Sequence, residues 1–307
     1  MTDSVSSSGI DPLSARLREL ADYLAAPAVG RLTEEQRALS LGIARRLVVD
    51  VAERLDRSID TEGLWREWLR GGLPGADRLA RLCFARAEEH RWRDLSAQRS
   101  SPPPILPDAD EAGADAPSVG TPLSDIDRAY LALQIADRRR FDALGHPALA
   151  IADLDGAVFR ALLLDIAAWR LAEVSQYQAR AAELGEAVRV ATERQTEGRG
   201  IADAGAAYHK ILGAGLSEAA GQAIARHDWP TLIALAAAAH RRSYDDMALA
   251  LLTAETAALP SLLAPLHLDR TALAPLEASL AMLPSRAVSD DSARDYGEML
   301  APGRITR

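Results

Sequence analysis

Residues 156–194, GAVFRALLLDIAAWRLAEVSQYQARAAELGEAVRVATER, decide the fold class of this chain. The stretch contains no proline, and it is rich in Ala, Leu, Arg and Glu, which lose little free energy on entering a helix. Its apolar side chains recur at steps of three and four residues, which places them on one helical face. They are Phe159, Leu162, Ile166, Trp169, Val174, Tyr177, Ala181, Leu184, Val188 and Ala191. We therefore predict one long central helix and an all-α protein built around it.

The two halves of this stretch differ in how much apolar surface they carry. The first half is apolar nearly all round, so we expect it to be buried. The second half keeps a narrow apolar stripe among Glu, Gln and Arg side chains, as in a helix with one side facing water or a partner. We take Val174, Tyr177, Leu184 and Val188 as candidate interaction residues. Packing of the stripe inside the protein is the open alternative.

The positive charge is almost all arginine, with Lys210 as the one lysine, and alanine is abundant; this composition is typical of a GC-rich bacterial coding sequence, and the cytoplasm is the default location. The chain has 307 residues, which favours two domains, with 48% hydrophobic residues and a mean hydropathy of -0.08. No apolar run approaches the roughly 18 residues of a membrane span, and residues 1–20 lack the pattern of a signal peptide. A single cysteine, Cys83, excludes a disulfide framework and a cysteine-based zinc cluster. The net charge of -9 argues against a general nucleic-acid-binding surface.

Breaks in the helical pattern divide the chain into five segments. We predict a disordered N-terminus at 1–10, a helical bundle at 11–99, a Pro-rich acidic linker at 100–121, an array of antiparallel helices at 122–284 and a loose tail at 285–307. Within the bundle, helices are expected to begin at Pro12, after the capping box of Thr33 with Gln36, after a cap at Asp60 or Thr61, and at Pro74.

The array from residue 122 onward is predicted from closely spaced helix starts. Beside the central helix, we expect helices over 124–144, 203–212, 217–227, 230–242, 244–258, 260–266 and 269–283. Helix pairs stacked side by side would form a solenoid-like arrangement, although no two units align beyond their apolar period.

No motif in the sequence assigns an activity. The histidines are scattered, without the His-Glu-x-x-His helical pair of zinc hydrolases, and neither a phosphate-binding loop nor a Gly-x-Ser-x-Gly elbow is present. We therefore predict no catalytic residue, no metal ligand and no cofactor. His90, beside Glu88 and Glu89, and His227 remain candidates for the alternative of an enzyme or phosphotransfer protein with a site assembled from distant residues.

Two further clusters qualify as interaction surfaces. Trp65 and Trp68 lie one turn apart on a short helix and suit a partner interface, since Trp is frequent at interface hot spots; core packing is the more common use. Arg138, Arg139 and Arg140 form the one basic run. It suits an acidic patch or a phosphate, and equally a solvated helix end.

Two stretches carry a resemblance to a family. Residues 32–55, LTEEQRALSLGIARRLVVDVAERL, resemble the opening of an uncharacterised alphaproteobacterial helical family catalogued as a domain of unknown function. That family shares a Leu-Ser/Thr-x-Glu-Glu/Gln start and a Leu-Val-x-Asp-Val segment. Residues 223–252, AIARHDWPTLIALAAAAHRRSYDDMALALL, are similar to its later helical units. The resemblance implies a bacterial, cytoplasmic, helical protein and supplies no functional residues.

These patterns favour a non-catalytic regulatory or adaptor protein that acts through helix-mediated contacts with another protein or with a second copy of itself. The alternatives are the enzyme or phosphotransfer protein described above, or a helical protein that binds a small ligand in an apolar cavity of the C-terminal array. No nucleic acid and no membrane is expected as a partner.

Overall fold

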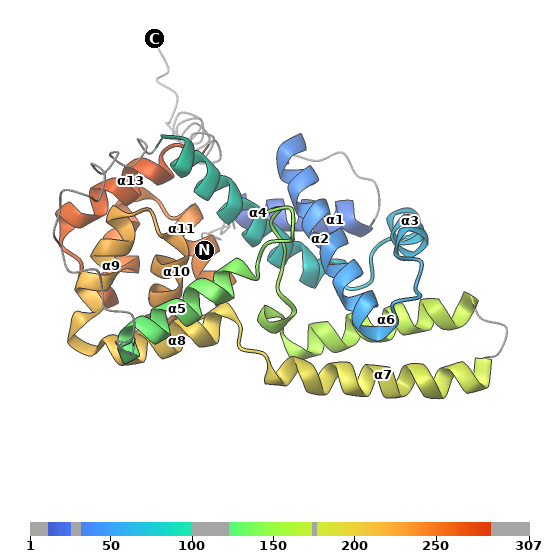
Figure 1. Cartoon of the computed structure of the whole chain (residues 1–307). Helices are drawn as coiled ribbons and strands as arrows, with labels where there is room; N and C mark the ends of the chain where they lie inside the picture. The colour runs from blue at the N-terminus through green and yellow to red at the C-terminus, as the bar shows by residue number, and fades with distance from the viewer. Residues whose placement is uncertain (1–11, 26–31, 100–122, 174–176, 284–307) are drawn as a thin grey trace, which may run out of the picture. The chain divides into compact units, whose positions relative to one another are not determined.

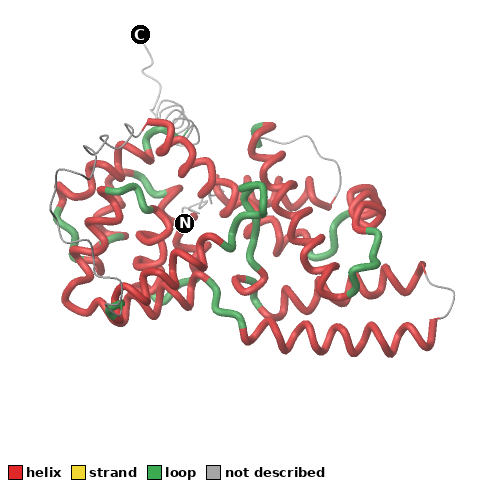
Figure 2. Tube along the Cα trace, viewed as in Figure 1, coloured by secondary structure: helices red, strands yellow, loops and turns green. Residues whose placement is uncertain are grey.

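The computed structural model describes residues 12–25, 32–99, 123–173 and 177–283. These residues form an all-α fold, as predicted: helices joined by loops, without a strand in the described ranges (Figure 2). A single antiparallel bridge joins Phe141 and Pro147. None of the described helices combines the length and the apolar character that crossing a membrane requires.

The chain forms two compact units, each assembled from separate segments. Unit 1 comprises residues 1–88 and 139–200, and unit 2 comprises residues 89–138 and 201–307. These units do not coincide with the predicted bundle at 11–99 and array at 122–284. The predicted linker at 100–121, the N-terminus at 1–10 and the tail at 285–307 lie outside the described residues.

Unit 1 is organised around a long helix, α2, which contacts α3, α6 and α7. Its core includes Ile43, Leu47 and Val51 of α2 and Phe159 and Ile166 of α6, all fully buried. The helices within this unit are α1 (Pro12–Ala25), α2 (Glu34–Leu55), α3 (Thr61–Gly71), the first half of α4 (Ala76–Arg99), the short η1 (Ile151–Asp153), α6 (Gly156–Glu173) and α7 (Tyr177–Glu197) (Figure 1).

Unit 2 surrounds α10, which is buried on every side from Trp229 to Ala237 and contacts α8, α9 and α11. The indole of Trp229 stacks on that of Trp92, with ring centroids 4.5 Å apart. The helices of the unit are the second half of α4, α5 (Asp125–Arg138), α8 (Ile201–Leu212), α9 (Leu216–Ala225), α10 (Trp229–His240), α11 (Tyr244–Thr253), α12 (Leu259–Leu262) and α13 (Ala274–Leu280), with short helices η2 (Gly213–Gly215), η3 (Thr256–Ala258), η4 (Ala264–Leu266) and η5 (Arg270–Leu273).

Local helix signals in the sequence are confirmed. Thr33 and Gln36 form the predicted capping box at the start of α2, with each side chain bonded to the other residue's backbone N–H. The Asp60 carboxylate accepts a hydrogen bond from the Gly63 N–H and caps α3. Such caps satisfy backbone donors that the first helical turn leaves without partners.

The prediction of one continuous helix over 156–194 is wrong. α6 ends at Glu173, α7 begins at Tyr177, and the two helices lie side by side (Figure 1). A single straight helix would leave the apolar stripe of its second half in water. Packing α7 against α6 and α2 instead buries Leu184, Val188 and Ala191, and this burial favours two helices.

Candidate functional site

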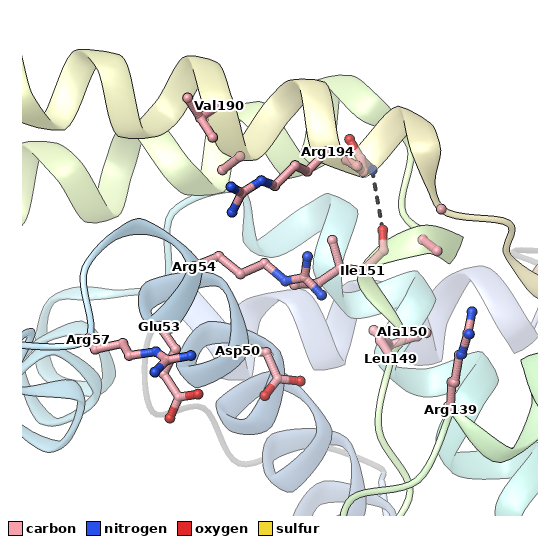
Figure 3. Close-up of a pocket in the computed structure, with 14 residues that line it drawn as sticks. Asp50, Glu53, Arg54, Arg57, Arg139, Leu149, Ala150, Ile151, Val190 and Arg194 are labelled. Atoms are coloured by element: carbon pink, nitrogen blue, oxygen red, sulfur yellow. Dashed lines mark hydrogen bonds between the residues drawn. The ribbon is translucent and has the colours of Figure 1, made fainter.

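Unit 1 contains a cleft of about 810 Å³ between α2, α7 and residues 149–152. This volume lies within the roughly 300–1,000 Å³ typical of sites for small molecules. The lining residues are Asp50, Glu53, Arg54, Arg57, Arg139, Leu149, Ala150, Ile151, Ala152, Val190, Ala191, Arg194, Gln195 and Gly198 (Figure 3). The cleft is therefore the principal candidate for a binding site.

One wall comes from the end of α2 and the turn that follows it. Asp50, Glu53 and Arg54 are spaced at i, i+3 and i+4 on α2, which places them on one helical face, and Arg57 follows in the turn after the helix. The same helix turns the fully buried Val51 toward the core. Burial of the apolar face thus fixes the direction in which the charged face points.

The opposite wall comes from α7, which is tied to the segment around η1. The Gln195 side-chain amide donates hydrogen bonds to the backbone oxygens of Ile151 at 3.3 Å and Leu154 at 2.9 Å. At Gly198 a Cβ atom would lie 3.2 Å from the Ala152 Cβ, so α7 and this segment approach closely. These contacts hold the apolar residues 149–152 in place along the cleft.

The cleft carries more positive than negative charge in a chain whose net charge is -9. The arginines of the lining outnumber its carboxylates, Asp50 and Glu53. Figure 3 shows Arg54 of α2 and Arg194 of α7 extending from facing helices into the space between them. A solvent-exposed cleft with this excess of guanidinium groups attracts anions.

Within the described chain, the four cleft arginines form no ion pair shorter than 4.0 Å; they are Arg54, Arg57, Arg139 and Arg194. Elsewhere on unit 1, the exposed Arg189 of α7 contacts both Glu186 and Glu193 at 2.5 Å. Arginine presents five N–H donors in a fork that matches phosphate and carboxylate oxygens. The donors of the cleft arginines are therefore available to a ligand.

The pKa of Asp50 is raised, first by partial burial in the cleft wall and then by the like charge of Glu53. Arg54 lowers this pKa but does not offset the other effects. Burial and the like charge of Glu53 thus both disfavour the ionised form of Asp50. A ligand that donates hydrogen bonds to the Asp50 carboxylate would stabilise that form.

The predicted basic run is divided between different environments. Arg138 is exposed at the end of α5, and Arg139 lines the cleft. Arg140 is 1% exposed, with its Nε 3.7 Å from the Asp153 Oδ2, and its backbone oxygen accepts a hydrogen bond from Arg86. Of the three, Arg139 belongs to the candidate site.

The other predicted interaction residues with described side chains are buried. Trp65 and Trp68 are each 7% exposed, in agreement with the core-packing alternative. Leu184 is 3% and Val188 is 7% exposed, which corresponds to packing of the stripe inside unit 1. Val174 and the Tyr177 side chain lie outside the described residues.

The histidines do not meet at a common centre. His90 lies 3.6 Å from the Asp94 carboxylate, and the His227 ring stacks on Trp229 with centroids 5.1 Å apart. Within the described ranges, no three His, Cys, Asp or Glu side chains are grouped closely enough to hold a metal ion.

A smaller pocket of about 280 Å³ lies in unit 2. Two of its polar lining residues bond to each other: the Tyr130 hydroxyl donates to the Asp228 Oδ2 at 2.9 Å. The amide of the neighbouring Gln134 donates to the same oxygen at 3.2 Å. The Asp228 Oδ1 accepts from the Thr231 N–H at the start of α10. Burial, followed by the charge of Asp228, raises the pKa of Tyr130 to about 12, so the phenol stays a proton donor in this network. The arrangement stabilises a helix start.

The sequence prediction did not include most of the cleft. Arg139 was the only cleft residue among the predicted interaction residues. The signal that could have identified part of the site is the helical spacing of the charged residues on α2. The contribution of α7 depends on how the chain folds back, which the predicted single helix obscured.

Comparison of the chain with protein-family models, with curated proteins and with solved structures found no match. The resemblance of residues 32–55 and 223–252 to an alphaproteobacterial helical family therefore stays a prediction.

Proposed function

We propose that this chain is a non-catalytic, cytoplasmic bacterial regulatory protein whose unit 1 binds an anionic molecule in the arginine-lined cleft. The observation that carries the proposal is the set of cleft arginines without ion-pair partners in the described chain. Arg54 and Arg194 extend into the same cleft from different helices (Figure 3).

The chemistry of the cleft favours binding over catalysis. Arginine keeps its proton at all physiological pH values, so it supplies charge and hydrogen bonds rather than proton transfer. Hydrogen bonds to charged groups contribute about 1.5–3 kcal/mol each to stability in measured cases. Two arginines that bond to one anion would therefore contribute measurably to its affinity.

The cleft is a better candidate for a binding surface than the apolar stripe of α7. The described stripe residues Leu184 and Val188 face the interior of unit 1, whereas the cleft is open to solvent and polar. A regulatory effect on another protein, or on a second copy of this chain, would then depend on the state of the cleft.

The test is calorimetric titration of the full chain with pyrophosphate and with citrate, in wild type and in Arg54→Ala/Arg194→Ala. We expect at least one probe to bind, at least about tenfold more weakly to the variant, since about 1.4 kcal/mol corresponds to a factor of ten. Binding should also weaken with added salt, which screens exposed charges.

Arg128→Ala/Arg189→Ala is the matched control. It removes the same charge from exposed, ion-paired positions outside the cleft. Failure of both probes to bind wild type, or an equal loss of affinity in the control, would contradict the proposal. Circular dichroism of each variant establishes that the helices remain formed.

A further inference from the structure

We propose that the ligand of the cleft is a nucleotide: an organic phosphate whose phosphates bind Arg54 and Arg194, and whose amino or hydroxyl groups donate to Asp50 and Glu53. This inference rests on the proposed anion-binding function and specifies the class of anion. Three properties of the cleft support it: its volume, its apolar wall and the position of its carboxylates.

The volume and the apolar wall of the cleft favour a ligand with an organic part. The cleft measures about 810 Å³, far more than an inorganic phosphate group fills. Its lining includes a continuous apolar segment, residues 149–152, together with Val190 and Ala191 of α7. Leu149, Ile151 and Ala191 are 5% exposed or less, so the apolar surface that a ligand can still remove from water lies on Ala150, Ala152 and Val190. Its removal is favourable by roughly 25 cal/mol per Å².

The arginines of the cleft favour a ligand that carries phosphate groups at one part. Arg54 and Arg194 approach from facing helices, and their planar forks match the tetrahedral oxygens of a phosphoryl group (Figure 3). The oxygens of a diphosphate are carried by two phosphorus atoms, so a diphosphate can contact two guanidinium groups together. Arg57 and Arg139 extend the positive lining beyond this pair.

The carboxylates of the cleft favour a ligand with hydrogen-bond donors at another part. Asp50 and Glu53 lie on the same face of α2 as Arg54, and each would repel a bare anion. The pKa of Asp50 is raised by burial and then by the like charge of Glu53, so a hydrogen-bond donor on the ligand would stabilise its ionised carboxylate. The exocyclic amine and ribose hydroxyls of a nucleotide are hydrogen-bond donors that carboxylates accept. A simple polyanion offers no such groups.

The carboxylates therefore distinguish a nucleotide from other anions. We would titrate ADP and pyrophosphate, without divalent cations, into wild type and Asp50→Ala/Glu53→Ala. Wild type is expected to bind ADP at least about tenfold more tightly than pyrophosphate. The variant should bind ADP about tenfold more weakly, because it loses two charged acceptors, yet bind pyrophosphate more tightly, because it loses two repelling charges.

Glu186→Ala/Glu193→Ala is the matched control for net charge. It removes two carboxylates from exposed positions of α7 outside the cleft, and it should change both affinities little and in the same direction. If the affinities for ADP and pyrophosphate both rise in Asp50→Ala/Glu53→Ala, the carboxylates only repel and the nucleotide inference is wrong.

The same inference is overturned if ADP binds wild type no better than pyrophosphate does. In either case the anion-binding function stands as long as Arg54→Ala/Arg194→Ala weakens pyrophosphate or citrate. If that arginine variant leaves the affinity for every probe unchanged, the proposed function itself fails.

Discussion

Replacement of Gly205 by alanine tests the packing of α8 against α10 in unit 2. Gly205 is buried in the middle of α8. A Cβ atom at this position would lie 2.7 Å from the Ala234 Cβ and 3.3 Å from the Ala234 Cα. Apolar carbon atoms in contact normally lie about 3.5–4.0 Å apart. The atoms that the new methyl group meets cannot rotate away, so the two helices must separate.

Two opposing effects determine how much Gly205→Ala changes the free energy of unfolding. Alanine is favoured over glycine in a helix interior by about 0.8–1.0 kcal/mol. Overpacking a filled core costs typically about 1–3 kcal/mol, and a contact with helix backbone lies at the upper end of that range. We expect Gly205→Ala to lower the free energy of unfolding by about 1–2 kcal/mol. At about 2–4 °C per kcal/mol for a domain of this size, the Tm falls by about 2–8 °C.

The assay is urea denaturation followed by circular dichroism, with Gly185→Ala as the control. Gly185 is exposed in α7, and a Cβ there meets no atom within 4 Å, so its substitution shows the helix-propensity effect alone. Gly185→Ala should raise the stability by about 0.5–1 kcal/mol. Equal stabilisation by both substitutions would refute the close approach of α8 and α10.

Three further predictions concern buried hydroxyls and the cleft. Ser40→Ala should raise the free energy of unfolding by about 1 kcal/mol in urea titration, because the fully buried Ser40 hydroxyl has no hydrogen-bond partner among the described residues; a loss would contradict this. Ser279→Ala should lower it by about 1–3 kcal/mol, since Ser279 accepts from the Trp92 indole at 2.6 Å and lies 2.7 Å from the Ser96 hydroxyl; unchanged stability would refute the network. Sulfate, which does not titrate, should bind the cleft more tightly as the pH falls through the raised pKa of Asp50, whose protonation removes a repelling charge; Asp50→Ala should reduce this dependence in calorimetry.

The all-α fold class and the helix starts were predictable from the sequence because they depend on neighbouring residues. The capping box of Thr33 with Gln36 needs only four consecutive residues in a specific backbone conformation. The same is true of Asp60, which bonds to a backbone N–H three residues ahead. These signals act within a single turn, so no knowledge of the tertiary fold is needed to read them.

The break of the 156–194 stretch into α6 and α7 was not predictable in this way. Helix periodicity continues across the break, because each of the two helices independently carries an apolar face. What separates them is the burial of side chains such as Leu184 and Val188, which depends on contacts with α2 and α6. Propensity within a window therefore favours one helix, whereas packing favours two.

The charged face of α2 shows why the candidate site also lay beyond sequence reasoning. Asp50 and Arg54 are four residues apart, and so are Glu53 and Arg57; in sequence this spacing favours ion pairs along a helix, although α2 ends at Leu55 and Arg57 lies in the following turn. Read locally, it describes an ordinary solvated surface. In the described structure neither pair closes to within 4.0 Å, whereas Arg189 of α7 contacts Glu193 at the same spacing. The difference is that the α2 residues line a cleft that α7 and residues 149–152 complete, so their charges are directed at a shared space. On an isolated helix these acidic and basic side chains would pair with one another. Only the tertiary fold directs them into a cleft where a ligand can bind.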